Sequence, residues 1–155
     1  MKVLTIWQPW ATLIMAGAKP YEFRGWIAPV SLQGKRIGIH AGKRPVRKAE
    51  IQDLIVRLRS ANAWSTCLKP EALPLLERWH QRPDMLPVSC VLGTAVLGRP
   101  RSGHDVAAEF GGPVNDSDRH GHANWAWPLT DIRQFEPPWP MRGAQGFWDL
   151  QVEDP

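Results

Sequence analysis

The apolar residues of this chain come in short runs, and these runs constrain its fold more than any other feature. None reaches the 18 consecutive apolar residues that suggest a membrane-spanning helix, so we expect no membrane partner. Each run is bounded by turn residues, and several alternate between apolar and polar positions, which is typical of strands. Strands are therefore predicted over residues 3–7, 21–24, 35–40, 88–97, 125–129 and 146–152.

Helical spacing is confined to a few segments. A helix of about two turns should follow Pro9 and end at Gly17. Pro45 should open a longer helix whose apolar face includes Ile51, and a third helix is expected over 70–81. The polar stretch 98–123 is predicted to be a loop, residues 137–140 a stiff turn, and Pro128 an edge or bulge position. The sum is a single α+β domain, 1–155, with about six strands in a mostly antiparallel sheet or small barrel and two or three helices.

The net charge of +4 is unevenly distributed. Residues 31–60 hold eight basic and two acidic side chains, whereas residues 104–131 hold five acids and one arginine. Such a bipolar chain can present a basic face to a polyanion such as RNA, although a solvated helix has similar charges. Gln8 and Pro9 interrupt the apolar N-terminus, so we expect no secretory signal and a cytoplasmic location.

Several kinds of chemistry are not supported by motifs. Residues 38–43 resemble a phosphate loop but are one residue short, and Arg44 stands where a magnesium-binding hydroxyl is needed. The zinc deaminase and nucleophile-elbow patterns do not occur. The His and Asp residues between 104 and 122 match no standard metal spacing and are interpreted as a hydrated loop. We therefore predict no cofactor and no metal.

The segment 17–24 has the most chemical content. Lys19 follows a predicted helix end, and alternation in the next strand places Glu22 and Arg24 on one face. A desolvated lysine near a carboxylate is a workable general base or nucleophile. The same residues can instead form a structural ion pair that closes a turn, and their spacing leaves both interpretations open.

The residues LTIWQPWA at 4–11, Leu13-Ile14, and Gly17-Ala-Lys19 followed by Glu22 and Arg24 closely resemble the opening signature of ASCH domains. Residues 39–41 and 143–148 resemble later strands of that family, while 60–120 carry no resemblance. The resemblance implies a small PUA-like mixed β-barrel with a cleft that binds RNA or its pieces. It also implies, for some members, hydrolysis of the amide of N4-acetylcytidine by a Lys, a Thr and a Glu.

This motif maps the family lysine onto Lys19, but Glu22 stands where the family threonine is expected. The family's later glutamate falls in the region without resemblance, and Glu109 is taken as its candidate. We take Lys19, Glu22 and Arg24 as candidate catalytic residues, with water as the attacking group. Trp10, Trp26, His40 and Lys43 are candidate substrate-binding residues, and most of the nine tryptophans are expected to serve packing.

Three functions follow as hypotheses. The first is an amidohydrolase that removes an acyl group from N4 of cytidine. The second is a non-catalytic RNA-binding module, and the third is a metal-independent ribonuclease that uses Lys19 and His40. RNA or a nucleoside is the expected partner in each case, and the oligomeric state is open.

Overall fold

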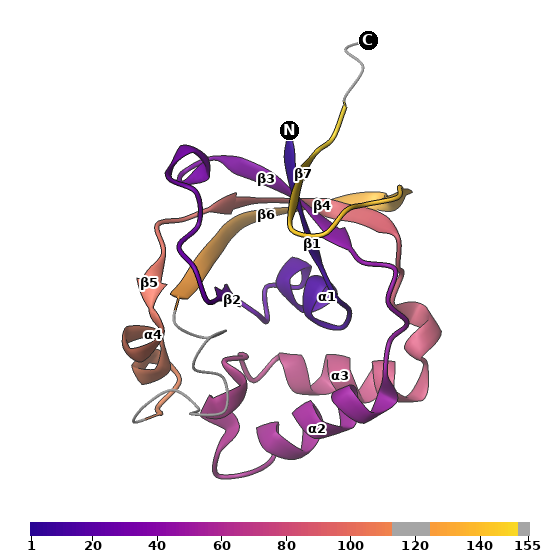
Figure 1. The fold of residues 1–155 in the computed structure, drawn as a ribbon. Coiled ribbons are helices and arrows are strands. Elements are labelled where there is room, and N and C mark those ends of the chain that lie inside the picture. Colours follow the sequence, from indigo (N-terminus) through magenta and orange to yellow (C-terminus); the bar gives the residue numbers. More distant parts are fainter. Residues whose placement is uncertain (113–124, 152–155) are drawn as a thin grey trace.

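The computed structural model describes residues 1–112 and 125–151. Its strands form one curled sheet in the order β2-β6-β4-β3-β1-β7, and β5 pairs with β6 beside this path. Figure 1 shows the sheet on one side and two long helices on the other. The strands are Lys2–Ile6 (β1), Tyr21–Arg24 (β2), Arg36–Ala41 (β3), Cys90–Leu97 (β4), Arg101–Ser102 (β5), Trp125–Pro140 (β6) and Phe147–Asp149 (β7).

The sheet is mixed. β1 and β3 run parallel, with Ile6 opposite Ala41, and every other pairing is antiparallel. The carboxyl ends of β1 and β3 therefore meet at one edge, which brings the residues after Ile6 close to those after Ala41. This architecture confirms the predicted α+β, PUA-like fold.

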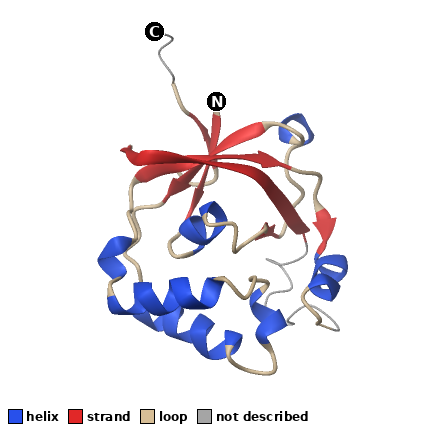
Figure 2. Cartoon of the chain, turned by 180° about the vertical axis from the view of Figure 1, so that it is seen from behind, coloured by secondary structure: helices blue, strands red, loops and turns tan. Residues whose placement is uncertain are grey.

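The helices form a second layer. α1 (Trp10–Met15) lies between the sheet and the pair formed by α2 (Lys48–Leu58) and α3 (Ala72–Gln81), as Figures 1 and 2 show. Ile14 packs into the apolar core beneath the sheet, whereas Leu13 packs into a second core with α2 and α3. Trp10 contacts both cores. The short first helix thus joins the two layers.

A buried glutamine fixes the start of α1. Gln8 is fully buried, and its side-chain oxygen accepts a hydrogen bond from the Thr12 backbone N–H at 3.0 Å. Its Nε2 donates to Thr12 Oγ1 and to the Pro87 carbonyl, at 2.6 and 2.8 Å. A buried amide is stabilising only when its donors and acceptors are satisfied, and Gln8 meets that condition.

The predicted loop at 98–123 is wrong in its first part. β5 and α4 (Gly103–Glu109) occupy residues 101–109. Ser102 caps this helix by accepting a hydrogen bond from the His104 N–H, and Val106 and Ala107 are buried. This helix has few apolar positions, and the charged residues beside them obscure its periodicity in the sequence. The candidate ligands Asp116, Asp118, His120 and His122 lie outside the described residues.

The predicted turn at 137–140 is also wrong, because β6 continues through it. Val91 pairs with Trp139 and Cys90 with Pro140, after irregular register between Val91 and Gly93. Proline is tolerated in a strand at an edge, and among the described strands only β4 pairs with this part of β6. Pro128 lies where β6 changes its partner from β2 to β4.

Candidate functional site

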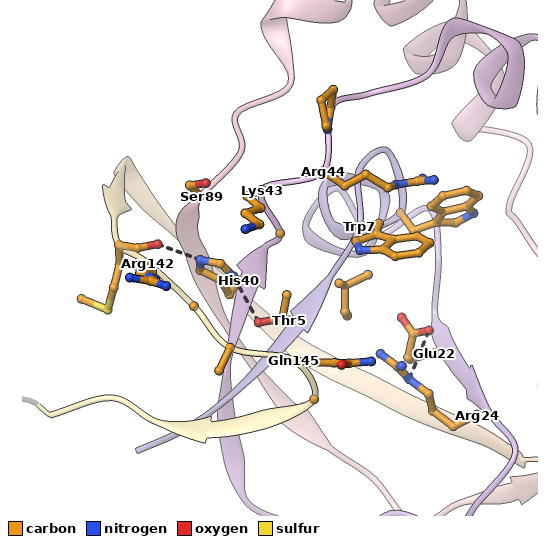
Figure 3. Close-up of a pocket in the computed structure, with 18 of the residues that line it drawn as sticks. Thr5, Trp7, Glu22, Arg24, His40, Lys43, Arg44, Ser89, Arg142 and Gln145 are labelled. Carbon is orange, nitrogen blue, oxygen red and sulfur yellow. Dashed lines mark hydrogen bonds and ion pairs between the residues drawn. The ribbon is translucent and has the colours of Figure 1, made fainter.

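A cleft opens where the carboxyl ends of β1 and β3 meet. Its volume is about 1310 Å³, larger than the roughly 300–1,000 Å³ of common small-ligand pockets. Figure 3 shows it between β2 on one side and the segment 141–146 on the other. The lining includes the predicted site residues Trp10, Glu22, Arg24, Trp26, His40 and Lys43.

Glu22 and Arg24 form one wall of the cleft. They alternate with Phe23 along β2, so both side chains face the same way, as predicted. Glu22 Oε1 lies 3.8 Å from Arg24 Nε, which is an ion-pair distance but too long for a hydrogen bond. Glu22 Oε2 and Arg24 Nε are buried and have no hydrogen-bond partner among the described residues. An acceptor and a donor thus stand side by side without partners on the cleft wall.

Lys19 lies elsewhere. Its side chain is 6% exposed, and Nζ lies 5.2 Å from the ring centroid of Phe23. Phe23 projects from the face of β2 opposite to Glu22, and Lys19 is not among the described residues that line the cleft. The structure therefore brings Glu22 and Arg24 together in the cleft and leaves Lys19 behind its wall.

Trp7 was not among the predicted site residues. It follows the last residue of β1, is 54% exposed, and lines the cleft. The Arg44 guanidinium lies 3.9 Å from the Trp7 ring centroid, and Glu50 holds that guanidinium by a 2.6 Å ion pair. Trp26 is 56% exposed on the same cleft. The signal that could have identified Trp7 is its position immediately after a parallel strand, where side chains collect at the sheet edge.

His40 is a buried residue in the floor of the cleft, and both of its ring nitrogens are hydrogen-bonded. Its Nε2 lies 2.8 Å from the Met141 carbonyl, and its Nδ1 lies 3.2 Å from Thr5 Oγ1. A carbonyl only accepts, so Nε2 carries a proton and donates to Met141, while Nδ1 shares a hydrogen bond with Thr5 Oγ1. Trp148 Nε1 donates in turn to Thr5 Oγ1 at 2.9 Å. Both ring nitrogens therefore have partners, and His40 connects Thr5 on β1 to the segment that begins at Met141.

The cleft is positively charged. Arg24, Lys43, Arg44 and Arg142 line it, while Glu22 is its single carboxylate among the described residues. Part of the predicted basic face is neutralised elsewhere: Arg36, Arg57 and Arg59 pair with Asp131, Asp53 and Glu77. The predicted basic face therefore divides into three ion-paired arginines, exposed cations such as Arg47 and Lys48, and the cations that line the cleft.

Glu109, the guessed third catalytic group, lies outside the cleft lining. It accepts hydrogen bonds from Tyr21 Oη, at 2.5 Å, and from Arg101. These two donors hold the pKa of the Glu109 carboxyl below its usual value. Burial, and then the hydrogen bond to Glu109, raises the pKa of Tyr21. The cluster links β2 to β5 and α4.

Two searches of the described residues bear on other functions. Residues 1–112 and 125–151 contain no group of three or more His, Cys, Asp or Glu side chains placed to hold a metal ion. Within the same ranges no helix has the length and apolar character needed to cross a membrane.

Comparison with known proteins identifies a matching family and solved structures with a similar fold. The model of the ASCH domain family matches residues 4–138. The crystal structure of ASCH from Zymomonas mobilis superposes with a TM-score of 0.52 at 17% identity, covering 97% of this chain and 87% of that chain. A point mutant of the same protein gives a TM-score of 0.52 at 17% identity, covering 97% and 89%. No curated protein sequence matches.

Proposed function

The chain belongs to the ASCH domain family, and from this premise we propose that its cleft binds RNA or a nucleotide fragment of RNA. The observation that carries the proposal is the meeting of exposed Trp7 and Trp26 with four cationic side chains in one cleft. Aromatic faces stack on bases, and cations attract the phosphates between them. Neither feature alone is specific, but a nucleotide is a ligand that uses both.

The cleft wall supports recognition of a base edge. Glu22 Oε2 is an acceptor and Arg24 Nε a donor, and both lack partners among the described residues. Cytosine offers an amino donor next to a ring-nitrogen acceptor, which is complementary to this pair. Other bases also offer a donor beside an acceptor, so the pair supports base binding without selecting one base.

A fluorescence anisotropy titration tests the proposal, with a labelled single-stranded RNA of about ten nucleotides, within the range of site sizes seen for single-strand binders. We expect binding whose log affinity falls linearly with log salt concentration. The matched control is a duplex RNA of the same sequence, whose stacked bases are not available to Trp7 and Trp26. Equal affinity for both, or no binding at low salt, would contradict the proposal.

A second candidate function is hydrolysis of the amide of an N4-acylated cytidine, favoured by the unpartnered, buried carboxylate oxygen of Glu22. Glu22 would take a proton from water as the water oxygen attacks the acyl carbon, and the resulting tetrahedral oxyanion would face Arg24. Collapse would break the C–N bond, and the proton on Glu22 would pass to the leaving N4 amine. Lys19, behind the wall, would act on this site through its charge.

Chromatography of N4-acetylcytidine incubated with wild-type protein tests this candidate. Cytidine should appear with wild-type protein, should be lost with Glu22→Gln, and should be reduced with Lys19→Ala. A full rate with Glu22→Gln would rule out the proposed base. The ribonuclease hypothesis has less support, because both ring nitrogens of His40 already hold partners.

A further inference from the structure

We propose that Lys43 and Arg142 form a phosphate subsite in the cleft, so that a nucleotide binds more tightly than the corresponding neutral nucleoside. This inference rests on the proposed function of the cleft and adds the chemical group that the basic end recognises. In Figure 3 the two side chains flank His40, away from the wall formed by Glu22 and Arg24. The cleft thus separates a region suited to a base edge from a region suited to an anion.

Lys43 and Arg142 differ from the other cations of the cleft in having no carboxylate partner. Arg24 lies 3.8 Å from Glu22, and Arg44 lies 2.6 Å from Glu50. Neither Lys43 nor Arg142 takes part in an ion pair anywhere in the described ranges. Both residues are exposed and line the cleft, so their charges are available to an anion that enters it.

The backbone next to Arg142 is held in place by hydrogen bonds. The Met141 N–H donates to the Ser89 carbonyl at 2.9 Å, and the Met141 carbonyl accepts from His40. Gly143 packs against the His40 ring so closely that an added Cβ would lie 2.4 Å from Cε1. Arg142 is therefore held between two fixed residues, which lowers the entropy lost when a ligand binds.

Lys43 is anchored in a similar way. It follows Gly42, whose N–H donates to the Ile6 carbonyl at 3.0 Å and so extends the pairing of β1 with β3. An arginine offers a planar fork and a lysine a compact point charge, and both are common phosphate ligands. The two segments come from distant parts of the chain and converge on His40.

Calorimetric titration at low salt with cytidine and with cytidine 5′-monophosphate tests the inference. The monophosphate should bind about tenfold more tightly, the effect of two exposed charge contacts of roughly 0.7 kcal/mol each. The double variant Lys43→Gln/Arg142→Gln should bind both ligands with equal affinity. The matched control is Arg47→Gln/Lys48→Gln, which removes the same charge from exposed residues outside the cleft lining.

The outcomes separate this inference from the function on which it rests. Equal binding of both ligands to wild-type protein overturns the phosphate subsite but leaves a nucleoside-binding cleft. An equal loss of the phosphate preference in the control variant also overturns it, because the effect would then be long-range charge. Failure of cytidine, its monophosphate and RNA to bind overturns both proposals.

A trinucleotide of cytidine identifies the source of the phosphate. If it binds more tightly than the monophosphate, and the double variant removes that gain, the subsite takes the backbone of an RNA chain. If it binds no more tightly than the monophosphate, the subsite takes a mononucleotide. Both results support the subsite, whereas a trinucleotide affinity that the double variant leaves unchanged contradicts it.

Discussion

Glu22 Oε1 and Arg24 Nε lie 3.8 Å apart, close enough to attract each other and too far apart to share a hydrogen bond. The side chain of Glu22 is only 12% exposed, so its carboxylate has lost much of its water. A buried carboxylate in this state is costly to the folded protein, because it has no hydrogen-bonded ion pair that would repay its desolvation. The cost is offset when a bound ligand donates the hydrogen bond that the Glu22 carboxylate lacks.

Glu22→Gln should therefore separate stability from binding. Gln keeps the shape of Glu22, and no hydrogen bond joins Glu22 to Arg24, so the free energy of unfolding should change by less than about 1 kcal/mol. Nucleotide affinity should fall about tenfold, since a charge-assisted hydrogen bond to the base is lost. Urea denaturation and calorimetric titration measure the two quantities. A destabilised variant with wild-type affinity would assign Glu22 a purely structural role.

Trp7→Ala and Trp26→Ala should each weaken RNA binding by about 1–3 kcal/mol, the usual value of a base stacked on an aromatic ring. Trp139→Ala is the matched control, because Trp139 is 44% exposed, stacks on Phe135 and lies outside the cleft lining. Anisotropy titrations with the single-stranded RNA compare the three variants. A similar loss in Trp139→Ala would show that stacking is not confined to the cleft.

Gly143→Ala should disturb the cleft without touching a charged group. Its Cβ would lie 2.4 Å from His40 Cε1, so the segment 141–146 must move. Overpacking of this kind costs about 1–3 kcal/mol, and the displaced Arg142 should reduce the preference for cytidine 5′-monophosphate over cytidine. Thermal unfolding and calorimetry report the two effects. A wild-type stability together with a wild-type preference for the monophosphate would mean that the segment 141–146 is loosely held.

The cluster of Glu109, Tyr21 and Arg101 makes the free energy of unfolding slightly sensitive to acid. Hydrogen bonds from Tyr21 and Arg101 hold the pKa of Glu109 below its ordinary 4.5 in the folded state. A lowered pKa contributes stability above the unfolded value, and this contribution is lost as the pH falls through the folded value. The two ion-paired side chains are 40% and 42% exposed, so the contribution should stay below about 1 kcal/mol.

Urea denaturation of wild-type protein and Glu109→Gln checks this expectation. The wild type should be the more stable protein at pH 7, and the difference should shrink below the ordinary pKa of about 4.5 and vanish once the pH is below the lowered pKa of the folded state. RNA affinity at pH 7 should be the same in both proteins, because Glu109 lies outside the described cleft lining. A large loss of affinity in Glu109→Gln would instead favour the catalytic role first guessed for it.

Local patterns predicted much of this fold because they were strong and uninterrupted. The alternation at Tyr21–Arg24 gave both the strand and the shared face of Glu22 and Arg24. The apolar stripe that includes Ile51 gave a helix whose observed bounds, Lys48–Leu58, differ from the prediction mainly at its start. The long strand through Pro137 and Pro138 was missed, because its stability comes from pairing with β4 rather than from its own residues.

The site was predictable only in part for a similar reason. Trp10, Trp26, His40 and Lys43 were expected near a cleft, but Trp7, Arg44 and Arg142 depend on which strands become neighbours. Met141, which precedes Arg142, contacts His40 through a hydrogen bond that spans 101 positions. Single-sequence patterns do not report contacts of that range. The burial of Lys19 behind Phe23 is likewise a property of packing.

The pairing of β7 with β1 has a consequence for how the cleft is assembled. The two strands lie far apart in the sequence, and the cleft wall at 141–146 lies between β6 and β7. Trp7, Glu22 and Lys43 therefore face the opposite wall only once β7 has paired with β1. The cleft is a product of long-range strand pairing and exists only in the folded sheet.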